Sequence, residues 1–222
     1  MKLGVFYHCK ISGEGIPNPS AANLIVAEQM AALRNSGLAQ EADVHVGING
    51  SDLDAMEIVG LLVENAKLHV HGNLARWEFP TLRLLQQWSI DNPNSAVFYH
   101  HGKGVTNPED EFRRHHRREM ERFLVWNWRE CVYDLQRGYE AVGINLVDPI
   151  SRPVLPGRYF AGNFWWAQTN FVAKLAPIPS DCTDRIFAEG WLLSCPGPTV
   201  CLDYERPDLY KHWEHACIVR RA

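Results

Sequence analysis

Two histidines and a lysine follow an apolar run in the segment AVFYHHGKGVTN, residues 96–107. His100, His101 and Lys103 can each donate hydrogen bonds to an oxyanion, and the lysine stands between two glycines. Glycines let a ligand come close to the backbone, so the segment could bind a phosphate. The GxxxxGK[ST] spacing of a Walker P-loop is absent. The histidines could instead bind a metal ion or satisfy neighbouring backbone groups.

The segment GNFWWA, residues 162–167, could bind a sugar. In a strand, Trp165 and Trp166 would point to opposite faces, so that one could pack while the other lines a cleft. Indole faces stack on the C–H faces of sugar rings, and the Asn163 amide can bond to hydroxyl groups. The alternative is that both indoles pack in the core, since tryptophans are usually well buried.

Two acidic segments are candidates for chemistry. Glu189 stands between apolar residues and could act as a general base, or it could pair with Arg185 at i,i+4 spacing. Asp52 and Asp54 match the Asp-Xaa-Asp pattern by which many nucleotide-sugar enzymes hold a metal. They directly follow Ser51, however, and capping of a helix explains them more simply. We interpret this acidic pair as structural.

A basic segment, FRRHHRREMER at residues 112–122, contains five arginines and two histidines. Arginines near a pocket suit diphosphate recognition, because the guanidinium group is a fork of donors. Most of these arginines are expected on a solvated helix face. The net charge of −4 gives no general attraction to nucleic acid.

Alternating strands and helices must position these residues. The pattern predicts strands at 3–7, 43–48, 66–71 and 95–99, and helices at 21–35, 52–62 and 79–88, the first with Ser20 as its N-cap. This order indicates βαβ units and a mainly parallel sheet, and each predicted strand ends in polar residues. Ligands on such sheets bind beyond the carboxyl ends of the strands, so we expect one shared site there.

The second half of the chain begins with the longest predicted helix. An apolar stripe runs from Met120 to Leu135, so we expect one helix over 110–137, closed by Gly138, and then a strand at 140–147. No internal repeat or linker is evident. We therefore expect one domain over residues 1–222.

The composition is that of an ordinary globular protein, with 46% hydrophobic and 22% charged residues. No apolar run approaches the length of a membrane span. The opening MKLGVFYHCK does not have the pattern of a signal peptide, and the six cysteines show no CxxC spacing. We therefore expect a cytoplasmic protein with reduced thiols.

Five segments taken together resemble nucleotide-sugar glycosyltransferases of the compact GT-A type, found in bacterial polysaccharide clusters and large algal viruses. The similarity covers about residues 77–191 and preserves the order of the motifs. These are EFPTL (78–82), YHHGKGV (99–105), Arg117 with Met120, GNFWWA (162–167) and AEGW (188–191). GNFWWA is the most specific of them. The first 70 residues match only as a generic nucleotide-binding half.

The sequence departs from the family pattern at two positions. Gly102 stands where the family usually has Ser or Thr, which removes a hydroxyl group that could contact phosphate or metal. His116 stands where the family has Trp, immediately before Arg117. The resemblance also implies that the HxKG strand end takes the place of Asp-Xaa-Asp in other GT-A enzymes. Dependence on Mn²⁺ or Mg²⁺ is thus open, with His101 as the candidate ligand.

The resemblance implies a GT-A-like, Rossmann-like α/β domain whose residues 1–105 bind the nucleotide and whose residues 106–222 bind sugar and acceptor. The expected activity is transfer of a sugar from a nucleotide-diphosphate donor, UDP-like by preference, to a hydroxyl of a glycan in polysaccharide biosynthesis. The expected roles are nucleotide binding by Tyr7, His8 and Asn49; diphosphate binding by His101, Lys103 and Arg117; sugar or acceptor binding by Asn163, Trp165 and Trp166; and catalysis by Glu189.

Two other functions fit the same residues. A glycan-binding module without catalysis would use the tryptophans. A metal-dependent hydrolase would use His100, His101 and an acid such as Asp110. The expected partners of the transferase are a nucleotide sugar and a glycan, with no nucleic acid and no membrane span.

Overall fold

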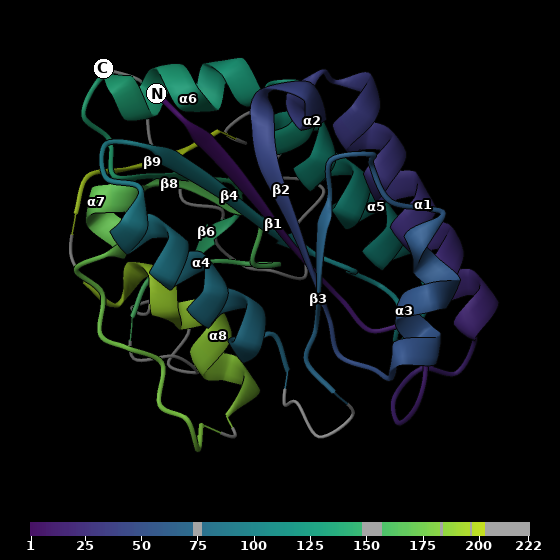
Figure 1. Ribbon diagram of the computed structural model, residues 1–222. Helices are drawn as coiled ribbons and strands as arrows, with labels where there is room; N and C mark the ends of the chain where they lie inside the picture. The colour runs from purple at the N-terminus through teal and green to yellow at the C-terminus, as the bar shows by residue number, and fades with distance from the viewer. Residues whose placement is uncertain (73–76, 148–156, 183, 196, 203–222) are drawn as a thin grey trace.

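The protein folds into three layers, with a twisted central sheet between two layers of helices (Figure 1). The computed structural model describes residues 1–72, 77–147, 157–182, 184–195 and 197–202. The predicted mainly parallel sheet flanked by helices is confirmed. Strands from both halves of the chain belong to this one sheet.

The central sheet has seven strands in the order β3-β2-β1-β4-β8-β5-β9. Among the described strands of this sheet, β8 alone runs antiparallel to its neighbours. The strands are β1 (Leu3–Cys9), β2 (Ala42–Ile48), β3 (Lys67–Val70), β4 (Ala96–His101), β5 (Ala141–Gly143), β8 (Trp165–Gln168) and β9 (Thr199–Cys201). A separate antiparallel pair is formed by β6 (Leu146–Val147) and β7 (Tyr159–Phe160).

Helices cover both faces of the sheet because side chains alternate along each strand. In β1, Val5 and Tyr7 pack towards one layer and Phe6 towards the other. The first layer contains α1 (Pro19–Asn35), α2 (Leu38–Glu41), α3 (Asp52–Val59), α5 (Glu111–Glu121) and α6 (Trp128–Gln136). The second contains α4 (Phe79–Asp91), α7 (Thr169–Val172) and α8 (Arg185–Trp191), which continues into a 3₁₀ turn at Leu192–Ser194.

The N-termini of α1 and α3 show which residues cap these helices. Asn18, not the predicted Ser20, caps α1, and its side chain accepts a hydrogen bond from Ala21 N at 3.0 Å. The reason is Pro19, whose fixed φ angle suits the first helical position and leaves the residue before it as the cap. For α3, Ser51 and Asp54 form a reciprocal capping box, which confirms the structural interpretation of the Asp-Xaa-Asp pattern.

The predicted single helix over 110–137 is wrong in one respect. A π-helical segment, Arg122–Trp126, separates α5 from α6. The wider turn shifts the phase of the apolar stripe, so that Leu124 and Val125 are both buried. Its carbonyl groups bond to side chains: Trp166 donates to Leu124 O at 2.8 Å, and Asn127 donates to Arg122 O at 2.8 Å.

The predicted strand at 140–147 is two short strands, β5 and β6. Asn145 lies between them with a φ of +55°, which an extended strand cannot contain. After the helical segment, Gly138 takes a φ of +102°, as a closing glycine should.

The cysteines that the structure describes, Cys9, Cys131, Cys182, Cys195 and Cys201, are all free thiols. Within the described ranges, no helix has both the length and the apolar character that crossing a bilayer requires. The sixth cysteine, Cys217, lies outside the described residues.

Candidate functional site

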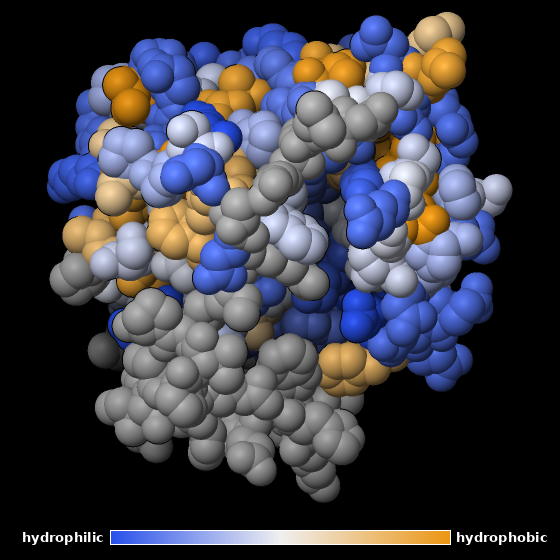
Figure 2. Space-filling view, turned by 90° about the horizontal axis from the view of Figure 1, so that it is seen from below, coloured by the Kyte–Doolittle hydropathy of each residue, from blue (hydrophilic) through white to orange (hydrophobic). Residues whose placement is uncertain are grey.

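The order of the strands reverses between β1 and β4. The chain passes from β1 outwards to β2 and β3, and then returns to place β4 on the other side of β1. All four strands are parallel, so their carboxyl ends meet at one edge, with His8 of β1 in register with His101 of β4. An edge where the strand order reverses is the usual ligand site of open α/β sheets. Figure 2 looks onto this edge and shows a hollow with hydrophilic residues at its depth.

The loop after β4 closes over the end of β1. Gly102 N donates to His8 O at 2.9 Å, and Lys103 N donates to His101 O at 2.6 Å. A Cβ atom at Gly102 would lie 3.2 Å from Val105 Cγ1 and 3.5 Å from the Tyr7 hydroxyl. A side chain at position 102 would therefore crowd Val105, which favours a glycine there. The structure therefore brings His8, His101 and Lys103 together, as the sequence predicts.

Arg117 holds this loop in position. Its Nη1 donates to Lys103 O at 3.0 Å, and its Nη2 donates to Glu28 Oε2 at 2.5 Å. Nε lies 3.7 Å from Glu121 Oε1, and the side chain is only 3% exposed. The expectation that Arg117 binds the diphosphate directly is corrected, because its guanidinium group is buried and paired with two carboxylates. Arg117 is instead a positioning residue for the Lys103 backbone.

Tyr7 supports the same loop and is not exposed to a ligand. Its hydroxyl donates to Gln29 Oε1 at 2.9 Å, and Gln29 Nε2 donates to His101 O at 3.2 Å. The Tyr7 side chain is fully buried, and burial raises the pKa of its hydroxyl well above the usual value. The expected contact of Tyr7 with the nucleotide is therefore wrong: odd positions of β1 face the first helix layer and the core.

Polar side chains gather on the α4 face of the sheet beside the loop. His8 Nδ1 lies 2.8 Å from Thr81 Oγ1, and His71 Nε2 lies 3.1 Å from the same hydroxyl. Burial, with the nearby His101 and His71, holds the pKa of His8 well below its ordinary value. Burial, followed by His69, lowers the pKa of His71 to about 4. Both rings are thus neutral at pH 7 and can act there as hydrogen-bond partners.

A second polar group holds His101 from the β8 side. The His101 Nε2 atom donates to Gly162 O at 2.9 Å, which assigns the ring tautomer with a lone pair on Nδ1. The next residue, Asn163, donates to Glu78 Oε2 at 2.8 Å and accepts from Trp165 Nε1 at 2.8 Å. The Tyr99 hydroxyl also donates to Glu78 Oε2. Glu78 thereby fixes the turn that positions His101.

The structure corrects the expected sugar-binding residues. Trp165 is 1% exposed and Trp166 is fully buried, on opposite faces of the sheet. β8 lies inside the sheet, so helices cover both of its faces, and neither indole lines a cleft. Asn163 is 1% exposed and its amide group is occupied by Glu78 and Trp165. These three residues support the site and do not line it.

Asn49 lies at the predicted edge but is turned towards another loop. Its amide nitrogen donates to Trp77 O, and its side chain is buried. Its backbone N–H donates to Cys9 O at 2.9 Å, which joins the ends of β2 and β1. The expected contact between the Asn49 side chain and a nucleotide is corrected to a structural role, since the buried amide holds Trp77.

Glu189 lies on α8, which packs against β7. Its side chain is half-buried, and within the described ranges its carboxylate has no hydrogen-bond or ion-pair partner. The alternative pairing with Arg185 involves a side chain outside the described residues. The catalytic role of Glu189 therefore stays a prediction.

His100 and His101 cannot both bind one metal ion, as the alternative hydrolase would require. His100 and His101 follow each other in β4 and point to opposite faces; His100 is fully buried between Tyr7 and Phe98. Asp110 caps α5 and pairs with Arg113. Among the residues that the structure describes, no three His, Cys, Asp or Glu side chains are close enough to hold a metal ion. Dependence on Mn²⁺ or Mg²⁺, with His101 as the candidate ligand, stays a prediction.

Sequence reasoning missed Glu78, Thr81 and Trp77 as members of this edge. Glu78 and Thr81 belong to the EFPTL segment. The sequence feature that could have identified them is a carboxylate and a hydroxyl group at the start of a helix that follows a strand. Trp77 gave no signal by itself, because an exposed tryptophan cannot be told from a buried one by type.

The fold is that of a three-layer α/β protein, with a candidate ligand site where the strand order reverses. The chain belongs to the family described as "Domain of unknown function (DUF8361)", whose sequence model matches residues 6–185. No curated protein matches the sequence.

Two solved structures are distantly similar. One is Rv0371c from Mycobacterium tuberculosis H37Rv, with 11% identity, a TM-score of 0.45, and coverage of 91% of this chain and 88% of the other. The other is 4-diphosphocytidyl-2C-methyl-D-erythritol synthase from Anaerococcus prevotii DSM 20548, with 14% identity, a TM-score of 0.43, and coverage of 90% and 88%.

Proposed function

We propose that the protein is a GT-A-like glycosyltransferase that moves a sugar from a nucleotide-diphosphate donor to a hydroxyl group of a glycan. The observation that carries the proposal is the fastened loop at the β1–β4 edge. This loop contains Lys103 and follows His101 at the carboxyl ends of β1 and β4. Open α/β sheets usually bind their ligands at such an edge. The motif resemblance supports the sugar donor, with a UDP-like nucleotide preferred.

The chemistry follows from charge. When the bond between the anomeric carbon and the diphosphate breaks, the leaving diphosphate gains negative charge. Lys103 supplies a cation that stabilises this charge, and Arg117 already holds the loop through Lys103 O, so the backbone does not reorganise. The Nε2–H of His101 donates to Gly162 O, so this ring positions the loop and does not donate to the diphosphate. This pre-organisation lowers the barrier of the transfer.

The carboxylate of Glu189 takes the proton of the acceptor hydroxyl if the reaction inverts the anomeric carbon, or orients the acceptor if the reaction retains it. Its half-buried position and the absence of a partner among the described side chains fit either role. No step is routed through a metal ion, and dependence on Mn²⁺ or Mg²⁺ stays a prediction. The glycan acceptor is part of the proposal.

The buried tryptophans weaken the rival glycan-binding module, because that function requires an exposed indole surface at GNFWWA. The opposite orientations of His100 and His101 weaken the rival hydrolase. Neither rival has an observation of its own in its favour.

The experiment separates binding from turnover. UDP binding and sugar transfer from a UDP-sugar panel would be measured for the wild type, Lys103→Ala and Glu189→Gln. Lys174→Ala and Glu64→Gln are matched controls, since both residues are exposed and neither belongs to the site. The proposal expects Lys103→Ala to weaken UDP binding at least about tenfold, because a charge-assisted contact contributes more than 1.4 kcal/mol.

Glu189→Gln should bind UDP as the wild type does while turnover falls by about 10²-fold or more, which is typical of a lost general base. A wild type that binds neither UDP nor any other nucleoside diphosphate contradicts the proposal. So does full turnover in both variants.

A further inference from the structure

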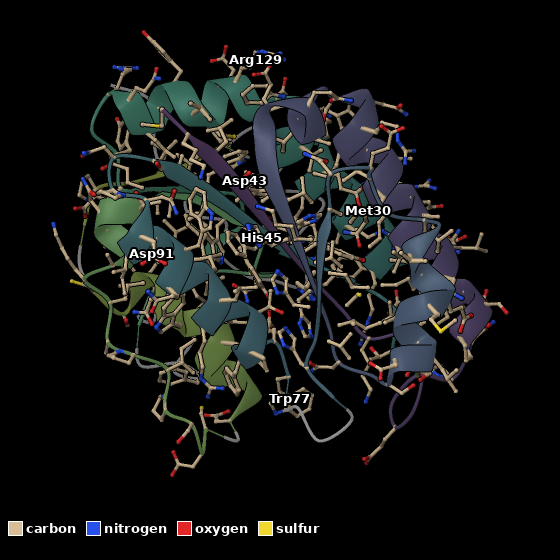
Figure 3. The ribbon with its side chains drawn as sticks, viewed as in Figure 1. Met30, Asp43, His45, Trp77, Asp91 and Arg129 are labelled. Carbon is tan, nitrogen blue, oxygen red and sulfur yellow. The ribbon has the colours of Figure 1, made fainter. Side chains whose placement is uncertain are left out.

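The Trp77 side chain is exposed, whereas most of the described tryptophans are buried. Its side chain is 46% exposed, whereas five other described tryptophans are at most 9% exposed. Trp126 is the remaining exposed indole in the described ranges, on the π-helical segment. Figure 3 shows Trp77 at the lower edge of the sheet, near the start of α4 and on the side viewed in Figure 2.

The backbone at Trp77 is in a strained conformation. Its φ of +50° lies in the left-handed region, which is unfavourable for a bulky residue. The Asn49 amide holds this conformation by donating to Trp77 O. The same turn buries Glu78 and Phe79, yet it leaves the indole at the surface.

The order of the strands determines where Trp77 lies relative to the proposed diphosphate site at Lys103. Asn49, which holds Trp77, follows β2, whereas His101 ends β4, with β1 between them. Two strand spacings separate these ends by about 10 Å. Asn163 precedes β8, on the opposite side of β4. A donor has its base and its sugar on opposite sides of the diphosphate.

We infer that the Trp77 indole stacks on the nucleobase of the donor and thereby makes the site select a nucleoside diphosphate over a bare diphosphate. The inference rests on the proposed function, since it takes the diphosphate to lie at Lys103. With the phosphates there, the sugar extends towards β8 and the base towards β2 and Trp77. A flat aromatic face held at the surface accepts any base, because every base has a π-face. Trp77 therefore determines affinity for the nucleoside part.

The test compares two probes that differ by the nucleoside. Binding of UDP and of inorganic pyrophosphate would be measured by calorimetry for the wild type, Trp77→Ala, Trp77→Phe and the control Trp126→Ala. Trp77→Ala should weaken UDP binding roughly 10- to 100-fold, the range typical of base stacking, and leave pyrophosphate binding unchanged. Trp77→Phe keeps an aromatic face and should stay within about threefold of the wild type, as should Trp126→Ala.

Three results would overturn the inference. Trp77→Ala could bind UDP as tightly as the wild type, or it could lose UDP and pyrophosphate equally, which would indicate a structural role. It could also weaken binding of glucose 1-phosphate and not of UDP, which would place the sugar on the indole. A wild type that binds pyrophosphate but no nucleoside diphosphate defeats the proposed function as well.

A readout without substitution covers the case in which Trp77→Ala does not fold. Indole fluorescence of the wild type should be quenched on adding UDP and not on adding pyrophosphate, because only the base contacts the exposed ring. No difference between the two probes at saturating concentrations would contradict stacking.

Discussion

Arg117 shows how a residue of the right type can serve a site without touching the ligand. Its guanidinium group bonds to Lys103 O and to Glu28, with Glu121 nearby. Arg117→Ala leaves the buried Glu121 without its cation, and removing one partner of a buried ion pair costs about 3–5 kcal/mol. Chemical denaturation should show that loss. A change below about 1 kcal/mol would contradict the anchoring role.

Glu121 should make stability depend on pH near neutrality. Burial raises the pKa of its carboxyl group from 4.5 to about 7, against the opposing effect of Arg117. A folded-state pKa above the unfolded value favours folding below pH 4.5, and this advantage is lost as the pH rises through 7. Glu121→Gln should remove that part of the pH dependence, whereas the exposed Glu64→Gln should not. Urea denaturation at pH 5 and pH 8 measures the difference.

His100 is a polar side chain in the core. It is fully buried, and within the described residues neither ring nitrogen has a hydrogen-bond partner. Burial, followed by His101, lowers its pKa to about 3, so the ring is neutral. His100→Phe keeps an aromatic ring between Tyr7 and Phe98 and should stabilise the fold by about 1 kcal/mol. A lower melting temperature would show that the ring has a partner role.

At the scale of elements, the caps provide a direct comparison. Asn18→Ala removes the side-chain acceptor of the α1 N-terminus and should cost about 0.5–2 kcal/mol. Ser20→Ala, two residues away on the same helix, should change stability by less than about 0.5 kcal/mol. Thermal denaturation of both variants decides which residue caps the helix. Equal losses would contradict the assignment.

The elements that the sequence predicts well are those with strong periodic patterns. The strand over 43–48 and the helix over 79–88 agree closely with β2 and α4, because alternation and helical spacing are local properties. The π-helical segment at Arg122–Trp126 could not be predicted. Its apolar stripe has ordinary helical spacing, and the Leu124 carbonyl group bonds to Trp166, which lies 42 residues further along the chain.

The sequence predicts where the candidate site lies, but not the contacts within it. Polar strand ends indicate the edge, so the meeting of His8 with His101 was foreseeable. The burial of Trp165 and Trp166 was not, because it depends on β8 entering the sheet between β4 and β5. A single sequence does not determine that pairing of distant strands, and so it cannot separate a supporting residue from one that touches the ligand.

At the scale of the molecule, acid should destabilise the fold. Burial lowers the pKa of six histidines: His8, His45, His69, His71, His100 and His116. An unfolded chain protonates these residues near pH 6.5, whereas the folded protein keeps them neutral to lower pH. The free energy of unfolding should therefore fall as the pH decreases from about 6.5 to 4. Constant stability over this range would contradict the buried, neutral rings.

The central claim is that the loop after β4 binds the diphosphate of an activated sugar. A crystal structure of the protein with UDP tests it most directly. The account predicts a phosphate oxygen within about 3 Å of the Lys103 Nζ atom, the distance of a charge-assisted hydrogen bond. A diphosphate bound elsewhere, with Lys103 left in solvent, would contradict it.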